Sequence, residues 1–295
     1  MQGSLCLRAG VLYVARQAQA AFVRPYDFDG RPLSRGIRLV DEQGAPIAAG
    51  GIDVDSDRQV WVADTQRGCV RVFNLFGIQT ARFDGAVRAR DDARGTLHGA
   101  VDVALAETDE SRTLYVGSRG WRRHALQAFR SDGAVLDSLR PGGDPLGRFR
   151  DVQRIAVLGR FTYACEFGAA RVQVFRDDEH LFSFRPLDER GAVAPPAALA
   201  PLADGRMLIA TGAEDARLLL VDGSGRTVRE LARTGREGFD IRHPGDVVAE
   251  FANDERSTRI ALIDRDGERV QVFTLEGACH GEFADLPGHA VGEAE

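Results

Sequence analysis

Two aspartates and a cysteine occupy similar places in short apolar segments of the sequence. Asp53 lies in GIDV, Asp102 in AVDV and Cys6 in SLCL. Carboxylates and thiolates bind metal ions, and a carboxylate with a raised pKa acts as a general base. If the fold places these segments side by side, Asp53 and Asp102 are candidate catalytic residues. The favoured interpretation, however, is that both carboxylates accept hydrogen bonds from backbone N–H groups and ordered water, and the catalytic role is the alternative.

Two histidines are candidate metal ligands. His98 in LHGAVDV and His243 in RHPGDVV each precede a further apolar segment. Catalytic zinc takes three protein ligands and keeps a fourth position open. His124 supplies a third imidazole only if its loop folds inward. We therefore expect no cofactor and no bound metal; the alternative is zinc or calcium at the mouth of the central channel, with His98 and His243 as the metal ligands.

Arginines gather around one of the two tryptophans, in the segment RGWRRH from Arg119 to His124. Tryptophan with arginine is typical of protein-interface hot spots and of platforms on which bases stack. The alternative is that Trp121 folds back over its own element while the arginines are simply solvated. The candidate residues for partner or ligand binding are Arg94, Arg119, Trp121, Arg122, Arg123, Arg150 and Arg242.

Composition limits the classes of protein to consider. The 295 residues carry 38 basic side chains, all arginine, against 44 acidic ones, giving a formal net charge of -6. This balance excludes a generally basic nucleic-acid coat but not a local basic surface. No apolar run approaches the roughly 20 residues that span a bilayer, and no signal-peptide pattern opens the chain. We expect a cytoplasmic protein that does not associate with membranes.

The elements that must position these residues come from a repeat. One strand-like segment recurs six times, as VLYVAR, VWVADT, TLYVGS, FTYACE, MLIATG and IALIDR. A later strand in each copy ends in a large apolar residue, at Tyr26, Phe73, Phe129, Phe175, Val221 and Phe273. Repeats of 40 to 50 residues with four short strands are typical of propellers. The sequence predicts an all-β, six-bladed β-propeller of four-stranded antiparallel blades over residues 1–287, with no strand exchanged between the termini. An acidic tail follows at 288–295.

The segment GIDVDSDRQVWVADTQRGCVRVFNLFG resembles the NHL-repeat family of propellers, and RVQVF recurs from Arg171 and from Arg269. The resemblance implies the fold and no single activity. Such propellers serve as binding platforms, as RNA-binding modules and occasionally as lyases or hydrolases. In amidating lyases of this type, zinc is bound by histidines near the positions of His98 and His243. A gluconolactonase-like hydrolase would require Glu, Asn and Asp together around calcium, whereas half of the ring around Asp53 is apolar.

The propeller topology divides the loops between two faces. Connections between blades and the loops joining second to third strands share one face, here called the upper face, and the remaining turns form the lower face. Sorting charges in this way predicts a basic upper face and an acidic lower face. Aligning the innermost strands on Ile52 places Asp53 and Asp102 at one level of the central channel.

We expect a non-enzymatic binding or scaffold propeller that captures an acidic protein partner or an anionic small molecule on its upper face. One alternative is a metal-dependent hydrolase or lyase at the channel mouth, using Asp53, Asp102, His98 and His243. Another is a propeller that binds single-stranded RNA.

Overall fold

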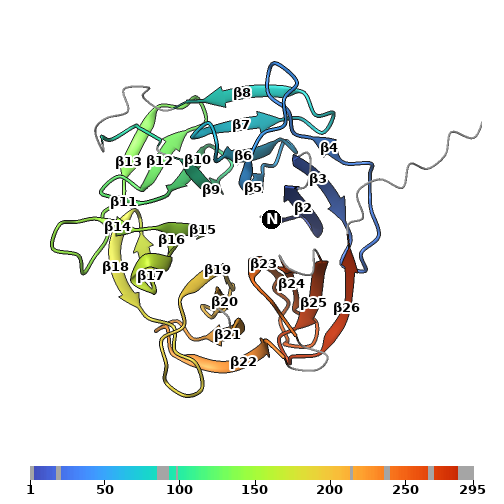
Figure 1. Ribbon diagram of the computed structural model, residues 1–295, viewed down its shortest axis with the longest axis vertical. Coiled ribbons are helices and arrows are strands. Elements are labelled where there is room, and N and C mark those ends of the chain that lie inside the picture. The colour runs from blue at the N-terminus through green and yellow to red at the C-terminus, as the bar shows by residue number, and fades with distance from the viewer. Residues whose placement is uncertain are drawn as a thin grey trace, which may run out of the picture.

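Six four-stranded antiparallel sheets follow one another around a central axis (Figure 1). This computed structural model describes residues 3–17, 21–84, 93–97, 99–212, 215–235, 240–264 and 269–284. Within every blade, strands adjacent in sequence are adjacent in the sheet. The predicted all-β propeller is therefore confirmed, and among the described residues no strand is exchanged between the first and last blades. The tail at 288–295 lies outside the described residues.

The first three blades are built from the N-terminal half of the chain. Blade 1 contains β1 (Gly3–Arg8), β2 (Val11–Gln17), β3 (Ala21–Tyr26) and β4 (Ile37–Arg38). Blade 2 contains β5 (Ala49–Val54), β6 (Val60–Asp64), β7 (Cys69–Phe73) and β8 (Gln79–Phe83). Blade 3 contains β9 (Ala100–Glu107), β10 (Arg112–Ser118), β12 (Leu126–Arg130) and β13 (Val135–Ser138).

The C-terminal half forms the other three blades. Blade 4 contains β15 (Val152–Leu158), β16 (Phe161–Glu166), β17 (Arg171–Arg176) and β18 (Glu179–Phe184). Blade 5 contains β19 (Pro196–Pro201), β20 (Met207–Thr211), β21 (Arg217–Val221) and β22 (Thr227–Arg233). Blade 6 contains β23 (Pro244–Glu250), β24 (Arg259–Asp264), β25 (Arg269–Thr274) and β26 (Cys279–Ala284). Two further strands, β11 (Trp121–Arg122) and β14 (Phe149–Arg150), pair with each other outside the blades.

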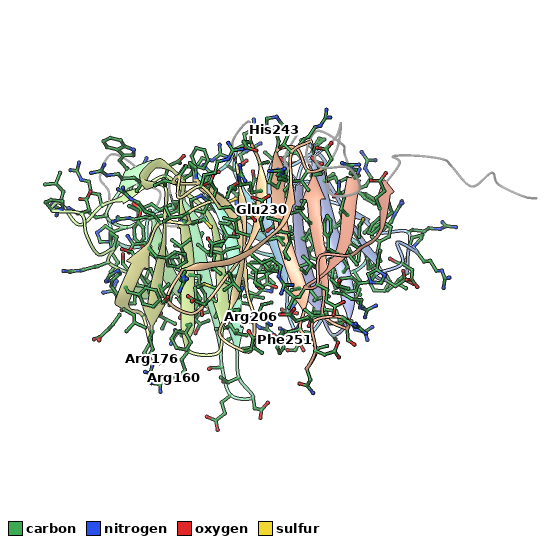
Figure 2. The ribbon with its side chains drawn as sticks, turned by 90° about the horizontal axis from the view of Figure 1, so that it is seen from below. Arg160, Arg176, Arg206, Glu230, His243 and Phe251 are labelled. Atoms are coloured by element: carbon green, nitrogen blue, oxygen red, sulfur yellow. The ribbon has the colours of Figure 1, made fainter. Side chains whose placement is uncertain are left out.

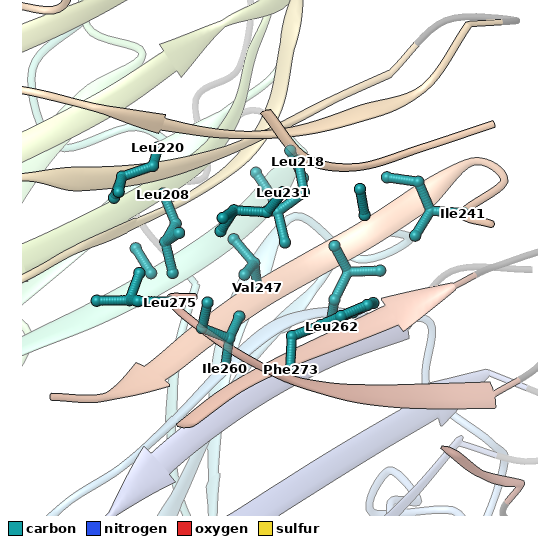
Figure 3. Close-up of a cluster of buried hydrophobic side chains, with 14 of the residues drawn as sticks. Leu208, Leu218, Leu220, Leu231, Ile241, Val247, Ile260, Leu262, Phe273 and Leu275 are labelled. Atoms are coloured by element: carbon teal, nitrogen blue, oxygen red, sulfur yellow. The ribbon is translucent and has the colours of Figure 1, made fainter. Parts of the chain in front are cut away.

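The apolar core lies between neighbouring blades. The second and third strands of a blade bury side chains on both of their faces, as in β6 and β7, where every residue is buried. Figure 3 shows one such layer, in which Leu208 and Leu218 of blade 5 meet Ile260 and Phe273 of blade 6. Because a four-stranded sheet has two apolar faces, it must be covered on both sides, and the ring satisfies this for all six blades.

Glycines in the turns between third and fourth strands pack closely against the preceding blade in blades 1, 3 and 5. A Cβ at Gly30 would lie 2.7 Å from the ring of Phe283, and a Cβ at Gly133 would lie 2.7 Å from the ring of Phe83. Both glycines have positive φ, +79° and +88°. Gly225 in blade 5 has the same conformation and packs against Phe184 of blade 4. These positions need glycine for the backbone and for the close approach.

The ring closes through side chains between blades 6 and 1. Asp246 at the start of β23 accepts hydrogen bonds from Ser4 Oγ at 2.8 Å and from the Leu5 N–H at 2.9 Å. Farther out, the rings of Tyr26 and Phe283 lie 5.0 Å apart. This seam therefore uses the same kind of bond as the seams between blades 2 and 3 and between blades 3 and 4, where Asp53 and Asp102 accept backbone N–H groups.

Alanine substitutions at Gly225 and Gly205 together separate the cost of the contact with Phe184 from the cost of the left-handed backbone. Gly205 is a matched control because its φ is also +87° while a Cβ there meets no atom within 4 Å. We expect Gly205→Ala to lower the free energy of unfolding by about 1–2 kcal/mol through the left-handed conformation alone. Gly225→Ala should lower it by about 1–3 kcal/mol more, because Phe184 must move. Urea unfolding of both variants measures the difference, and equal losses would contradict the role of this contact.

Candidate binding site on the upper face

Trp121 lies on a small ribbon that stands outside the six blades. In the ribbon, Trp121 of β11 is opposite Arg150 of β14, and Arg122 is opposite Phe149. Phe149 is completely buried and packs against Phe175 of blade 4, with ring centroids 6.2 Å apart. The ribbon is thus anchored to the blade, while the Trp121 side chain does not fold back and remains 67% exposed.

Arg150 fixes the orientation of the exposed ring. Its guanidinium lies over Trp121, 5.4 Å from the ring centroid, in cation–π geometry. The same guanidinium forms an ion pair with Asp144 at 3.1 Å, and the Arg150 N–H donates to Glu166 at 2.6 Å. The backbone N–H of Leu146, followed by Arg148 and Arg150, holds the pKa of Asp144 below its usual range. Trp121 is therefore presented by a charged, hydrogen-bonded support.

Two arginines beside Trp121 keep their charge available. The Nε of Arg122 donates to the carbonyl of Arg119 at 3.1 Å, which holds the two residues together. Within the described ranges, neither Arg119 nor Arg122 forms an ion pair with an acidic side chain. Arg123 follows in the same loop and is exposed. These side chains give the surface around Trp121 a local positive charge.

The structure places two of the predicted binding residues elsewhere. Arg94 donates to the carbonyl of Leu136 and lies 3.8 Å from Asp137, both on the outermost strand of blade 3. Arg242 is next to blade 6 and pairs with Asp240 at 3.1 Å. Only Arg119, Trp121, Arg122, Arg123 and Arg150 are therefore gathered on the ribbon and its loop.

Ion pairs reduce the difference in charge that the sequence predicts between the upper and lower faces. On the lower face, Arg112 contacts Asp55, Asp57 and Glu107 at 2.7–3.0 Å. On the upper face, Arg171 pairs with Glu166 at 2.5 Å. Counting arginines by loop overlooks such partners, because they come from other strands. The basic character is a local property of the Trp121 loop and not of the whole face.

The two channel aspartates lie at different levels, so their predicted alignment is wrong. In blade 2, Asp53 is the cross-strand partner of Trp61. Tyr115 of blade 3 corresponds to Trp61, and its cross-strand partner is Ala104. Asp102 lies two residues earlier, opposite Gly117, at the position that Gly51 occupies in blade 2. A Cβ at Gly51 would overlap the Asp102 carboxylate. The two aspartates lie in similar motifs, GIDV and AVDV, but they differ by two residues in register. Because side chains alternate along a strand, a shift of two residues leaves the same side chains facing inward.

Both aspartates connect one blade to the next. Asp53 Oδ2 accepts a hydrogen bond from the Leu105 N–H at 2.7 Å, and its Oδ1 accepts one from Cys6 Sγ at 3.1 Å. Asp102 Oδ2 accepts from the Ile155 N–H of blade 4 at 2.7 Å. Burial raises the pKa of Asp53, and burial together with nearby Asp246 raises the pKa of Asp102 to about 7. The perturbed carboxylates thus have structural bonds in the described chain.

A buried arginine, which the sequence reading did not single out, crosses the channel. Arg154 of β15 is 6% exposed and donates to the carbonyls of Gly3 and Gly245 at 2.9 Å and 3.2 Å. It also lies 3.8 Å from Asp102 and 3.6 Å from Asp246. Blade 4 is therefore tied to blades 3, 6 and 1 by one guanidinium. Its positive charge opposes binding of a cation next to Asp102.

The histidines are separated in the described structure. His243 lies on the upper face (Figure 2). The Nδ1 of His124 lies 2.7 Å from Ser138 Oγ on β13, so this histidine is bound to the outermost strand of blade 3 and not to the channel mouth. His98 lies outside the described residues. Among the residues that the structure describes, no three His, Cys, Asp or Glu side chains are grouped as metal ligands.

A cleft of about 300 Å³ opens on the lower face, at the seam between blades 6 and 1. Phe28 and Phe283 contribute its aromatic lining. Of its two arginines, Arg256 pairs with Glu276 at 2.9 Å, and Arg259 bonds to Glu250 while lying over the Phe28 ring. The cleft is thus on the opposite face from Trp121, and its cations already have acidic partners.

Comparisons with known proteins agree with this architecture. Residues 49–73 match the sequence profile of the NHL repeat, and this span coincides with strands β5 to β7. The crystal structure of the WD40 β-propeller domain of Doa1 superposes with a TM-score of 0.58 at 14% identity, covering 97% of this chain and 82% of that one. The structure of U3-55K superposes with a TM-score of 0.59 at 16% identity, covering 96% and 82%. No curated protein sequence matches the chain.

The predicted resemblance to NHL-repeat propellers is therefore confirmed in blade 2, and the chain has a propeller fold. At these identities the solved structures show the fold alone. Within the described residues, no helix has the length and apolar character needed to cross a bilayer.

The raised pKa of Asp102 predicts how stability varies with pH. Its folded-state pKa of about 7 exceeds the roughly 3.9 of an unfolded aspartate, so the folded protein binds the proton more tightly. The contribution of this group to the free energy of unfolding is therefore lost as pH rises through 7. Asparagine does not titrate, so the Asp102→Asn variant should not show this loss. When the pH is raised from 5 to 8, the free energy of unfolding of the variant should therefore increase by about 2–3 kcal/mol relative to that of the parent.

Urea unfolding at several pH values measures this difference. Asp109→Asn, in an exposed turn of the lower face, is the control and should follow the parent at every pH. If Asp102→Asn and the parent differ by the same amount at pH 5 and pH 8, the buried carboxylate does not titrate in this range.

Proposed function

We propose that this protein is a non-enzymatic binding propeller that captures an acidic protein surface with the Trp121 loop. One observation carries the proposal: an exposed tryptophan is held on a rigid ribbon among arginines, two of which have no acidic partner in the described chain. Tryptophan and arginine are the residues most enriched where binding energy concentrates. The ribbon also limits the entropy lost on binding, because Trp121 is already oriented.

The chemistry of the loop favours a carboxylate-bearing partner. Guanidinium groups form bidentate hydrogen bonds with carboxylates, and Arg119 and Arg122 can direct such bonds toward a partner beside the indole ring. Covering the ring removes a large apolar side chain from water and contributes about 1.5–3 kcal/mol. Single-stranded RNA is less favoured, because binding of that kind uses aromatic side chains for successive bases along a basic groove.

The two tryptophans allow a direct test by fluorescence. Trp61 is 3% exposed and stacks on Phe83 with centroids 5.6 Å apart, so acrylamide reaches mainly Trp121. A random copolymer of glutamate and tyrosine serves as the acidic probe. We expect saturable protection of Trp121 from quenching. Trp121→Ala with Arg122→Ala should weaken copolymer binding, followed by anisotropy of a labelled copolymer, at least tenfold. The melting temperature should fall by only a few degrees, since the removed ring is on the surface.

Two comparisons make the result specific. Polyuridylic acid tests the RNA alternative, and tighter binding of this polymer than of the copolymer would reject an acidic protein partner. Phe76→Ala is the control variant, because Phe76 is 88% exposed at the tip of the β7–β8 turn of blade 2, away from the ribbon. It should bind the copolymer like the parent. Equal binding by the double variant would remove the Trp121 loop from the site.

A further inference from the structure

A buried glutamine of blade 4 holds the beginning of the loop that leads into β14. Gln173 of β17 is completely buried, and its amide bonds to both backbone groups of Gly142. Its Oε1 accepts the Gly142 N–H at 3.3 Å, and its Nε2 donates to the Gly142 carbonyl at 3.2 Å. A side-chain amide that pairs with a backbone N–H and C=O in this way fixes the residue in position and orientation.

Glu166, at the end of β16, holds the other end of the same loop. Its side chain is also completely buried. Its Oε1 accepts the Arg150 N–H at 2.6 Å. Its Oε2 accepts from Gln173 Nε2 at 3.0 Å and from Arg171 Nε at 2.5 Å. Because a buried carboxylate is costly unless its oxygens are bonded, these donors fix the carboxylate in one orientation. The bond from Gln173 to Glu166 therefore joins the two ends of the loop.

The loop between these two points contains the support of Trp121. Asp144 accepts the N–H groups of Leu146 at 2.9 Å and of Arg148 at 3.3 Å. Its carboxylate also pairs with the guanidinium of Arg150, which lies over the Trp121 ring. Arg150 is thus held at its backbone by a buried carboxylate and at its side chain by Asp144. Both bonds determine where the indole ring is supported.

Glutamine occupies the same strand position in three blades. Gln127, Gln173 and Gln271 are buried, and each lies two residues before the phenylalanine at the end of its third strand. Gln127 accepts the Gly95 N–H at 2.6 Å. Gln271 donates to the Asp240 carbonyl at 2.8 Å. In all three blades, the bonded residue lies in the connection that enters the blade from the preceding one. This glutamine is therefore a recurring anchor for upper-face loops, which the apolar pattern of the sequence did not single out.

Blade 6 contains a network that corresponds to the one in blade 4. Arg269 pairs with Asp264 at 3.3 Å, and the Asp264 carboxylate also accepts the Arg242 N–H at 3.1 Å. Gln271 lies in an RVQVF segment, as Gln173 does. In the described part of the chain, no two-stranded ribbon is attached to blade 6. Blade 6 therefore supplies a control with similar anchoring and no exposed tryptophan.

We infer that Gln173 and Glu166 are positioning residues for the binding site, because they hold Arg150 and the loop that supports Trp121. This inference rests on the proposed function for its effect on binding, and it extends the site into the interior of blade 4. Both residues are completely buried, so neither touches a partner. A surface that is already ordered loses less entropy when the partner binds. Loss of the anchor should therefore weaken binding without removing any contact to the partner.

The variant Gln173→Met tests the inference, with Gln271→Met as the matched control. Methionine is similar in size to glutamine but cannot replace its hydrogen bonds, so each variant loses one anchor of the same kind. Hydrogen exchange of the segment 142–150, followed by mass spectrometry, reports on the loop without any partner. We expect the amides of this segment to exchange about tenfold faster in Gln173→Met. In Gln271→Met they should exchange at the parent's rate.

Binding of the labelled copolymer of glutamate and tyrosine shows whether the anchor acts through Trp121. We expect Gln173→Met to raise the Kd about fivefold to tenfold and Gln271→Met to leave it unchanged. When Trp121→Ala is already present, Gln173→Met should change the Kd little, because no indole ring remains to be positioned. A general loss of stability would instead affect both backgrounds alike.

The two measurements separate failure of this inference from failure of the proposed function. Exchange of the segment 142–150 at the parent's rate in Gln173→Met would overturn the positioning role. Faster exchange with an unchanged Kd, or equal effects of Gln173→Met and Gln271→Met on the Kd, would also overturn it. Failure of the parent to bind the copolymer would reject the proposed function, and the exchange rates would then decide whether Gln173 holds the loop.

Discussion

The inner carboxylates that accept backbone N–H groups from a neighbouring blade are the interaction on which the ring depends. Asp53 binds blade 3, Asp102 binds blade 4 and Asp246 binds blade 1. A buried carboxylate is costly unless its oxygens are hydrogen-bonded, so these residues hold the strands at defined separations. The bond from Asp246 matters most, because in the part of the chain that the structure describes no exchanged strand joins the first blade to the last. Arg154 adds a second connection across the same axis.

The upper surface depends on this ring but uses different chemistry. The ribbon of β11 and β14 takes its position from buried Phe149, whereas its opposite side carries Trp121 into solvent. Residues that stabilise the ring and residues that are available to a partner are consequently separate in sequence, even where they are adjacent in space.

The sequence predicts the blades well because their physical pattern is periodic. Buried residues such as Phe73 and Phe175 recur at the end of each third strand, and the turns between strands contain residues that favour turns. The ribbon could not be predicted in the same way, since a strand of two residues has no period. The sequence cannot distinguish the levels of Asp53 and Asp102, because a two-residue shift preserves the inward-facing pattern. Ion pairs such as Arg94 with Asp137 join distant strands, and no local pattern encodes them.

The turn glycines give the ring a direction. Gly30, Gly133 and Gly225 each sit on the outermost strand of the preceding blade, so blades 1, 3 and 5 each bring the part that fits their predecessor. Gene duplication of one blade would therefore supply a matching seam at both of its borders. In propellers closed by a shared strand, the two ends must evolve together. Here the described part of the chain joins blade 6 to blade 1 through the side chain of Asp246, so this seam depends on single residues in place of a whole strand.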